Sequence, residues 1–260
     1  MRIAVTGSKG QVATSLLERA GPKAEVVALG RPAFDLTDRA GVIAGLEAAR
    51  PDVIVNAAAY TAVDKAEAEE AVATHVNGDG AGHVAEAAAR LRVPLLHLST
   101  DYVFDGVLDR PYREDDPTAP AGAYGRSKLA GEKLVADRCE DSVILRTAWV
   151  YSPFGANFVR TMLRLNETRD EVGVVADQRG NPTSALDIAD ALLAIAAKVK
   201  DDSSPALRGV FHMTGSGEAT WADFAEAVFH EAATRGRRVT KVKRIGTADY
   251  PTPARRPANT

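Results

Sequence analysis

Short apolar runs alternate with helical patterns along almost the whole chain, and this alternation restricts the fold more than any other feature. The apolar runs are Ile3–Val5, Val26–Leu29, Val53–Asn56, Leu95–Leu98, Val143–Arg146, Val172–Val175 and Val210–Met213. Helical patterns cover roughly 11–20, 38–50, 63–92 with a break near 70, 124–138, 157–168, 184–199 and 221–235. Short buried strands separated by helices predict a parallel sheet covered on both faces. We therefore expect an α/β fold built on a doubly wound parallel sheet.

The first apolar run leads directly into a glycine turn and then into a helical pattern. Gly7 permits the tight turn, and Gly10 lets the backbone approach a pyrophosphate. Ala13 stands where a third glycine is usual and still allows the helix to pack closely on the strand. A pyrophosphate would then meet the free N–H groups and the positive dipole end of the helix. This order of elements predicts a Rossmann-type dinucleotide site at the N-terminus.

Tyr124 and Lys128 are four residues apart in a predicted helix, and Thr100 follows the end of a predicted strand. Residues at this spacing share a helix face, so the Lys128 ammonium can lie near the phenol. A unit charge at about 4 Å, with an effective dielectric constant near 20, lowers a phenol pKa by about three units, whereas desolvation raises it. Thr100 can donate to a carbonyl oxygen at the carboxyl end of the strand. The three residues predict a site that protonates a carbonyl oxygen while a hydride arrives. The plain alternatives are a hydroxyl turn and an unrelated pair on a surface helix.

The composition is that of a compact enzyme. The 260 residues suffice for one α/β domain with a small lobe, and the net charge of −3 is interspersed, so we expect no nucleic-acid partner. No run of 18 apolar residues and no signal-peptide pattern occur, so we expect no membrane span. The single cysteine, Cys139, is consistent with a reducing cytoplasm. The histidines lack metal-ligand spacing, and we interpret His97 and His212 as interior, hydrogen-bonded residues.

Several segments carry a family resemblance that covers nearly the whole chain. They are Gly7-x-x-Gly10-Gln11-Val12, the segment 50–64, Ser99-Thr100-Asp101-Tyr102-Val103-Phe104, Tyr124-Gly125-x-x-Lys128-Leu129-x-Gly131-Glu132, Arg146-Thr147-x-Trp149-Val150-Tyr151, Asn157-Phe158, the segment 177–183 and the tail 250–257. The dinucleotide turn is generic, whereas the Thr-Asp-Tyr segment, the Trp segment and the Pro-Arg tail are more specific. On these motifs the chain resembles the extended short-chain dehydrogenases/reductases, and among them the dTDP-4-dehydrorhamnose reductases.

The resemblance implies a role for each matching residue. Tyr124 would donate the proton, Lys128 would lower its pKa and hold the nicotinamide ribose, and Thr100 would orient the sugar carbonyl. The implied cofactor contacts are Gly7, Gly10, Gln11, Val12, Ala59, Tyr60 and Thr61, with Asp35 and Leu36 beside the adenine. The implied sugar pocket consists of Asp101, Tyr102 and Trp149, with Arg255 paired to the substrate pyrophosphate. A solvated basic tail is the alternative interpretation of Arg255.

The implied activity is reduction of the C4 carbonyl of dTDP-4-dehydrorhamnose by NAD(P)H, which gives dTDP-L-rhamnose. Many relatives have an acidic residue at the end of the second strand, where this chain has Gly30 followed by Arg31. Without that carboxylate a 2′-phosphate is not repelled, and Arg31 can bind it, so we expect NADPH to be preferred and NADH to be accepted. Two alternatives stay open: a reductase of another nucleotide 4-keto-6-deoxy sugar, and a non-catalytic regulatory subunit that resembles methionine adenosyltransferase β.

We expect a dinucleotide-binding core over residues 1–150, to which parts of 170–215 return. Residues 151–260 would form mainly a smaller substrate-binding lobe. The family's C-terminal helices have no counterpart after Thr260, so we expect this lobe to be C-terminally incomplete. The segment Asp105–Gly122 is rich in Pro, Asp and Gly and is expected to be one long functional loop. A monomer and a homodimer both stay open, and no metal ligand is assigned.

Overall fold

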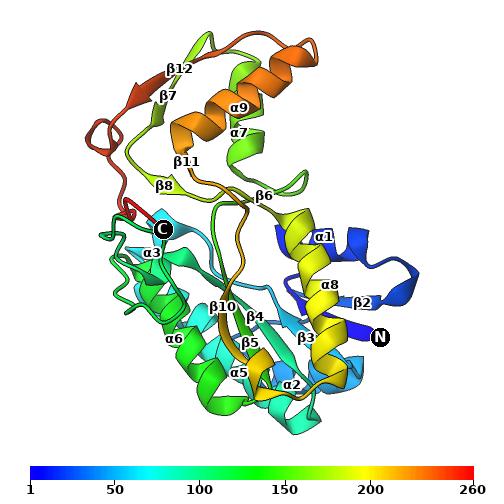
Figure 1. Cartoon of the computed structure of the whole chain (residues 1–260). Helices are drawn as coiled ribbons and strands as arrows, with labels where there is room; N and C mark the ends of the chain where they lie inside the picture. Colours follow the sequence, from blue (N-terminus) through cyan, green and yellow to red (C-terminus); the bar gives the residue numbers. More distant parts are fainter.

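A six-stranded sheet forms the centre of the computed structural model, which describes residues 1–260 apart from the side chain of Lys23. The strands are β1 (Arg2–Thr6), β2 (Glu25–Leu29), β3 (Val53–Asn56), β4 (Leu95–Thr100), β5 (Ser142–Thr147) and β10 (Gly209–His212). They lie in the order β10-β5-β4-β3-β1-β2, and every neighbouring pair is parallel. The direction of winding reverses between β1 and β3, where the carboxyl ends of strands leave a crevice for ligands. The predicted doubly wound parallel sheet is confirmed (Figure 1).

Helices cover both faces of this sheet because successive strand residues point to opposite sides. On one face α1 (Gln11–Arg19) and α8 (Ala185–Asp201) pack on Ile3, Val55 and Leu96. On the other face lie α2 (Arg39–Ala49), α5 (Gly80–Leu91) and α6 (Ala123–Arg138), packed on residues such as Ile54 and Leu95. Both clusters are almost fully buried. The predicted helix over 63–92 is broken, as expected, into α3 (Val63–Ala66), α4 (Glu70–Thr74), a π-helical turn over His75–Asp79, and α5.

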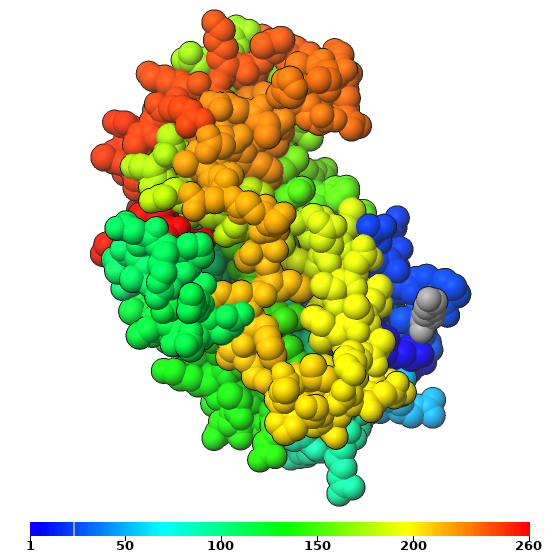
Figure 2. All heavy atoms as spheres, viewed as in Figure 1, coloured from blue at the N-terminus to red at the C-terminus, as the bar shows by residue number. Residues whose placement is uncertain are grey.

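A second, smaller cluster of elements stands above the carboxyl ends of the central strands (Figure 1). It contains α7 (Phe158–Asn166), β7 (Glu171–Val175), α9 (Trp221–Thr234) and β12 (Lys241–Ile245) around a core of Met162, Val174 and Phe229. The apolar run Val172–Val175 therefore lies outside the central sheet, because β7 pairs with β12 in parallel. We call this cluster the lobe. In Figure 2 the surface is hollowed between the lobe and the α1 side of the core.

Two short ribbons connect the core and the lobe. In the first, β6 (Val150–Tyr151) pairs with β9 (Thr183–Ser184), and in the second, β8 (Arg179–Gly180) pairs with β11 (Ala219–Thr220). Short 3-10 turns complete the chain at Gly21–Lys23, Asp101–Val103, Pro205–Leu207 and Thr247–Asp249. No helix in the described part of the chain combines the length and apolar character needed to cross a bilayer.

Candidate active site

The turn between β1 and α1 has the shape that a dinucleotide requires. Gly7 adopts φ +91°, a left-handed conformation, and a Cβ there would lie 3.1 Å from the backbone of Ala58. The Gly10 N–H donates to the Gly7 carbonyl oxygen at 2.9 Å and immediately precedes α1. Among the described residues, no side chain caps α1 and its first turn has no acidic residue. The free N–H groups at this helix end therefore fit a pyrophosphate.

Gln11, the first residue of α1, connects the turn to the lobe. Its Oε1 accepts hydrogen bonds from Ser152 Oγ at 2.8 Å and from Asn157 Nδ2 at 2.9 Å. Val12 is 9% exposed and belongs to the apolar cluster beneath α1. The side chain of Gln11 is hydrogen-bonded to the lobe, and that of Val12 is packed in the core. The cofactor contacts expected at these residues would therefore be made by their backbone N–H groups.

The end of β2 is shaped by a close approach to the glycine turn. A Cβ at Gly30 would lie 2.3 Å from Ser8 Oγ, so a larger residue at this position would displace the turn. The following residue, Arg31, is exposed. The carboxylate of Asp35 accepts from the backbone N–H of Thr37 at 2.9 Å and from its hydroxyl at 2.8 Å. These hydrogen bonds lower the pKa of Asp35, and the positive charge of Arg31 adds to the effect.

Leu36 lies in the core rather than on an open surface. Its side chain is 6% exposed and packs against Gly80, and its carbonyl oxygen accepts from His83 Nδ1 at 2.9 Å when that nitrogen is protonated. The adenine contact expected at Leu36 therefore stays a prediction.

Residues after β3 are joined to α6 by a buried asparagine. Asn77, in the π-helical turn, accepts from Tyr60 N at 2.7 Å and donates to Tyr60 O at 3.0 Å and to Ser127 Oγ at 2.9 Å. Ser127 donates in turn to the carbonyl oxygen of Tyr124 at 2.7 Å. The predicted cofactor residues Ala59, Tyr60 and Thr61 thus lie at a strand end that is tied to the helix carrying Tyr124. Sequence reasoning missed Asn77, because nothing in the segment distinguishes it from polar neighbours such as His75 and Asp79.

Thr100, Asp101, Tyr102 and Tyr124 are brought together at the carboxyl end of β4. The rings of Tyr102 and Tyr124 meet edge to face, with centroids 5.8 Å apart and an interplanar angle of 77°. Thr100 Oγ1 donates to Asp101 Oδ1 at 2.9 Å and accepts from Tyr102 N at 3.2 Å. The Thr100 proton therefore has an internal acceptor in this structure and must turn away from it to serve a substrate carbonyl.

The charge relation expected between Lys128 and Tyr124 needs correction. Lys128 is 2% exposed, and its Nζ donates to the Leu98 carbonyl oxygen at 2.7 Å. Burial lowers the pKa of Lys128 to about 8. Burial, followed by the Asp101 carboxylate, raises the pKa of Tyr124 to about 12, against the opposing hydrogen bond of Thr100. Lys128 does not lower the pKa of Tyr124 here, because desolvation exceeds the effect of an ammonium that is bound to the β4 backbone.

Asp101 carries a strongly perturbed carboxyl group beside Tyr124. It is 8% exposed, and burial raises its pKa to about 6, although hydrogen bonds from Thr260 and Thr100 oppose the shift. Thr260 Oγ1 donates to Asp101 Oδ2 at 2.6 Å. Burial also raises the pKa of Tyr102, and Asp101 adds to that shift, while the nearby Arg256 lowers it. The Asp101 carboxylate therefore raises the pKa of both neighbouring phenols, Tyr102 and Tyr124.

A buried ion pair fixes the helix that carries Tyr124 and Lys128. Arg146 Nη2 and Glu132 Oε2 are 2.8 Å apart, with both side chains about 5–6% exposed. Ser99 Oγ donates to Glu132 Oε1 at 2.5 Å. The pair therefore connects α6 with β4 and β5. The sequence motifs contained Glu132 and Arg146, but nothing in their spacing indicated that they meet.

The interior position of His97 is as predicted, but its hydrogen bonding is incomplete. His97 is 1% exposed, and its Nδ1 lies 3.0 Å from Asn56 Nδ2. Its Nε2, like that of His212, is buried without a hydrogen-bond partner in the part of the chain that the structure describes. Burial, with the charge of Lys128, lowers the pKa of His97, so the ring is neutral. The prediction of hydrogen-bonded histidines is therefore wrong at Nε2.

Arg255 lies apart from the Tyr124 group. Arg255 is exposed beside a hollow of about 330 Å³ that Arg179 also lines, and Thr100, Tyr124 and Lys128 do not line it. The neighbouring Arg256 is held by Asp64, with Nη2 and Oδ2 2.9 Å apart. Sequence reasoning missed this pair, whose members are 192 residues apart. Trp149, after β5, packs against the lobe.

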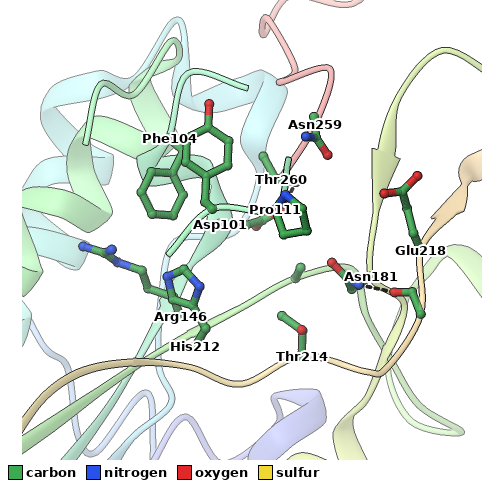
Figure 3. Close-up of a pocket in the computed structure, with 13 residues that line it drawn as sticks. Asp101, Phe104, Pro111, Arg146, Asn181, His212, Thr214, Glu218, Asn259 and Thr260 are labelled. Atoms are coloured by element: carbon green, nitrogen blue, oxygen red, sulfur yellow. Dashed lines mark hydrogen bonds between the residues drawn. The ribbon is translucent and has the colours of Figure 1, made fainter. Parts of the chain in front are cut away.

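A cavity of about 440 Å³ adjoins the site on the far side of Asp101. Figure 3 shows Arg146 and His212 on one side of this cavity and Asn181 and Glu218 on the other. Over the described residues, no group of three or more His, Cys, Asp or Glu side chains is arranged to hold a metal ion.

Comparison with known proteins agrees with this geometry. The family described as "RmlD substrate binding domain" matches residues 1–260. The dTDP-4-dehydrorhamnose reductase of Sinorhizobium fredii is 56% identical over 259 residues, which cover 100% of this chain and 88% of the relative. The corresponding Escherichia coli protein is 42% identical over 265 residues, with 100% and 88% covered.

Solved structures give the same result. The Bacillus anthracis dTDP-4-dehydrorhamnose reductase in complex with NADP superposes with a TM-score of 0.92 at 34% identity, covering 99% of this chain and 88% of that one. The Clostridium acetobutylicum protein superposes with a TM-score of 0.91 at 37% identity, covering 100% and 89%. The chain belongs to the dTDP-4-dehydrorhamnose reductase family of NAD(P)H-dependent oxidoreductases.

Proposed function

We propose that this chain reduces the C4 carbonyl of dTDP-4-dehydrorhamnose and that Tyr124 delivers the proton. NADPH, when bound at the glycine turn, would supply the hydride to the carbonyl carbon. With a pKa of about 12 the Tyr124 phenol keeps its proton at neutral pH, and the reduced oxygen, an alkoxide, is the stronger base that would take it. Thr100 would turn its hydroxyl from Asp101 to the same carbonyl oxygen, and Asp101, Tyr102 and Trp149 would line the sugar pocket.

The observation that carries this proposal is the meeting of Thr100 and Tyr124 at the carboxyl end of β4, beside a strand end joined to α6 through Asn77. Ligands of open parallel sheets bind at this edge. The glycine turn at α1 lies at the same edge of the sheet, because β1 and β3 are parallel neighbours and Thr6 pairs with Asn56. A sugar carbonyl at the end of β4 would therefore lie between the proton donor and the cofactor turn.

Lys128 positions the cofactor in this proposal. Its buried ammonium lies one helical turn after Tyr124, where it would hold the nicotinamide ribose and so orient the cofactor towards the carbonyl that Tyr124 protonates. Because its pKa is about 8, Lys128 is mostly charged at neutral pH but loses its proton in mild alkali. The contact of the charged ammonium with the ribose would therefore weaken above that pH.

We further propose that NADPH is preferred over NADH. Gly30 leaves no carboxylate to repel a 2′-phosphate, and the exposed Arg31 can form a charge-assisted hydrogen bond worth about 1.5–3 kcal/mol. Arg31 also interacts electrostatically with Asp35, and this interaction would limit the preference for NADPH over NADH. The substitution Arg31→Ala should reduce the ratio of kcat/KM for NADPH to that for NADH, and an unchanged ratio would show that Arg31 does not bind the phosphate.

The experiment that tests the function is a substrate panel with NADPH, in which cofactor oxidation is followed for dTDP-4-dehydrorhamnose and for the same sugar on another nucleotide. Preference for the dTDP sugar supports the proposal. Preference for another base supports the related-reductase alternative. Tight cofactor binding without turnover on any sugar would support the regulatory-subunit alternative, in which the Thr100, Tyr124 and Lys128 set is retained without catalysis.

A further inference from the structure

The two tryptophans of the chain stack face to face between the core and the lobe. Trp149 follows β5 of the core, and Trp221 is the first residue of α9 in the lobe. Their ring centroids are 3.5 Å apart and their planes differ by 6°. These are the only two tryptophans in the sequence. At this separation nothing fits between the rings, so one whole face of Trp149 is covered by Trp221.

Trp149 has an unusual backbone conformation that packing must hold. Its φ is +44°, in the left-handed region that bulky residues rarely adopt. Such a conformation persists only where the surroundings determine it, and it is common at ligand sites. The backbone N–H of Thr183 donates to the Trp149 carbonyl oxygen at 3.3 Å, which anchors the main chain but not the indole.

The ribbon of β8 and β11 supplies the contacts that orient the indole. Gly180 in β8 pairs with Ala219 in β11, and Trp221 follows directly after β11. A Cβ at Gly180 would lie 2.6 Å from Trp149 Cε2 and 2.7 Å from Nε1, so only glycine permits this position of the ring. The indole of Trp149 is thus fitted between Trp221 and the backbone of Gly180.

Trp221 is itself fixed by the start of α9. Thr220 and Asp223 form a capping box, in which Thr220 Oγ1 accepts from Asp223 N at 3.1 Å and Asp223 Oδ2 accepts from Thr220 N at 2.8 Å. The ring of Phe158 packs on Trp221 from the lobe, at a centroid distance of 4.6 Å. The lobe therefore presents a rigid surface to Trp149.

We propose that Trp221, with Gly180, is a positioning residue that holds Trp149 in the orientation needed to line the sugar pocket, and that the stacked pair couples the lobe to the core. This inference rests on the proposed function, in which Trp149 contacts the sugar. Trp221 acts through Trp149 and does not itself contact the cofactor or the reacting atoms. Loss of Trp221 should therefore affect the nucleotide sugar and leave NADPH binding unchanged.

The first test is spectroscopic and needs no substrate. Two indoles in contact should couple excitonically, with a couplet in the circular dichroism of the tryptophan bands that grows with the twist between their in-plane transition dipoles, and the chain has no other tryptophan to obscure it. Trp149→Phe and Trp221→Phe should each abolish the couplet, and Gly180→Ala should abolish it while both indoles are retained. A Gly180→Ala variant whose tryptophan circular dichroism is the same as that of the wild type would overturn the inference whatever the enzyme does.

The second test is a double-mutant cycle on kcat/KM for the dTDP sugar. Loss of an aromatic stack predicts that Trp221→Ala lowers this value about 2- to 12-fold, with Trp221→Phe largely restoring it. In a Trp149→Ala background the same substitution should have no further effect. Phe224→Ala is the matched control, because its ring pairs with Tyr151, Phe158 and Trp221 and not with Trp149. It should stay within about twofold of the wild type.

The outcomes separate the inference from the proposed function. If Trp149→Ala lowers kcat/KM but Trp221→Ala does not, the function stands and the positioning role is wrong. If Trp221→Ala is equally harmful with and without Trp149, Trp221 has a general structural role and the inference is wrong. If Trp149→Ala has no effect on the sugar, the role of Trp149 in the proposed function fails and the positioning role fails with it.

Discussion

Replacement of Lys128 by methionine should change how stability depends on pH. Lys128 is 2% exposed, and burial lowers its pKa from 10.5 to about 8. Below pH 8 Lys128 is charged in both the native and the unfolded chain. The native state then has the full free-energy cost of burying that charge. Between the two pKa values the native lysine is neutral while the unfolded one keeps its proton. The unfolded state then binds more protons than the native state. The contribution of Lys128 to the wild-type free energy of unfolding therefore increases as pH rises.

The magnitude follows from the size of the shift. A change of two to three pKa units corresponds to about 3 kcal/mol at about 1.4 kcal/mol for each unit. Methionine has a similar length and no charge, so Lys128→Met removes this pH-dependent part. It also leaves the Leu98 carbonyl oxygen without its donor, which costs about 1–3 kcal/mol at every pH. The variant should therefore lose about 3 kcal/mol of stability relative to the wild type as pH rises from 7 to beyond 10.

Urea unfolding of both proteins at several pH values measures this difference. Cys139 and Tyr124, whose pKa values burial raises to about 11 and about 12, also titrate in alkali but are present in both proteins. Their effects cancel to first order in the comparison. A difference that stays constant with pH, or that moves in favour of the variant, would refute the argument that Lys128 is desolvated.

Three further changes test other parts of the site. Tyr124→Phe removes the proton donor but keeps the ring, so turnover should fall about 10²–10⁴-fold with the NADPH dissociation constant nearly unchanged, and turnover within threefold of the wild type would contradict its role. Asp101 has its pKa raised to about 6 from 3.8, so its native state holds more protons than the unfolded state between these values and wild-type stability falls as pH rises through them. Asp101→Asn should therefore gain up to about 3 kcal/mol over the wild type between pH 4 and pH 7 in urea unfolding, and a gain independent of pH would be inconsistent with a buried, titrating carboxyl. Gly30→Ala would place a Cβ 2.3 Å from Ser8 Oγ, so NADPH binding should weaken about tenfold. The control Gly173→Ala, whose Cβ would meet Ile245 at an ordinary 3.5 Å, should bind NADPH normally.

The strands and helices of the core could be predicted because each has a clear apolar period. The expected run Leu95–Leu98 appears as β4, and the expected break near residue 70 separates α3 from α4. The strand β12 was missed because three of its five residues, Lys241, Lys243 and Arg244, are charged, so it has no apolar run. The pairing of β7 with β12, rather than with the central sheet, depends on which apolar faces meet, and periodicity does not contain that information.

Spacing pointed to Tyr124 and Lys128, and the family resemblance supplied most of the other expected site residues, but neither gave the electrostatics of the site. The interval from Tyr124 to Lys128 shows that they share a helix face, yet it does not reveal that Lys128 binds the Leu98 carbonyl or how deeply it is buried. Asn77 and the pair of Asp64 and Arg256 depend on contacts between distant segments. Desolvation and long-range pairing arise only when the chain is packed. The pKa of Tyr124 was therefore predicted to shift downward, whereas burial shifts it upward.

The most direct test of the central claim uses NADPH labelled with deuterium at the transferred position. The enzyme is given dTDP-4-dehydrorhamnose, and the product is examined by NMR. Our account predicts dTDP-L-rhamnose with one deuterium at C4 for each cofactor oxidised, and loss of this product in Tyr124→Phe. Product without deuterium at C4, or unchanged labelled product from Tyr124→Phe, would contradict it.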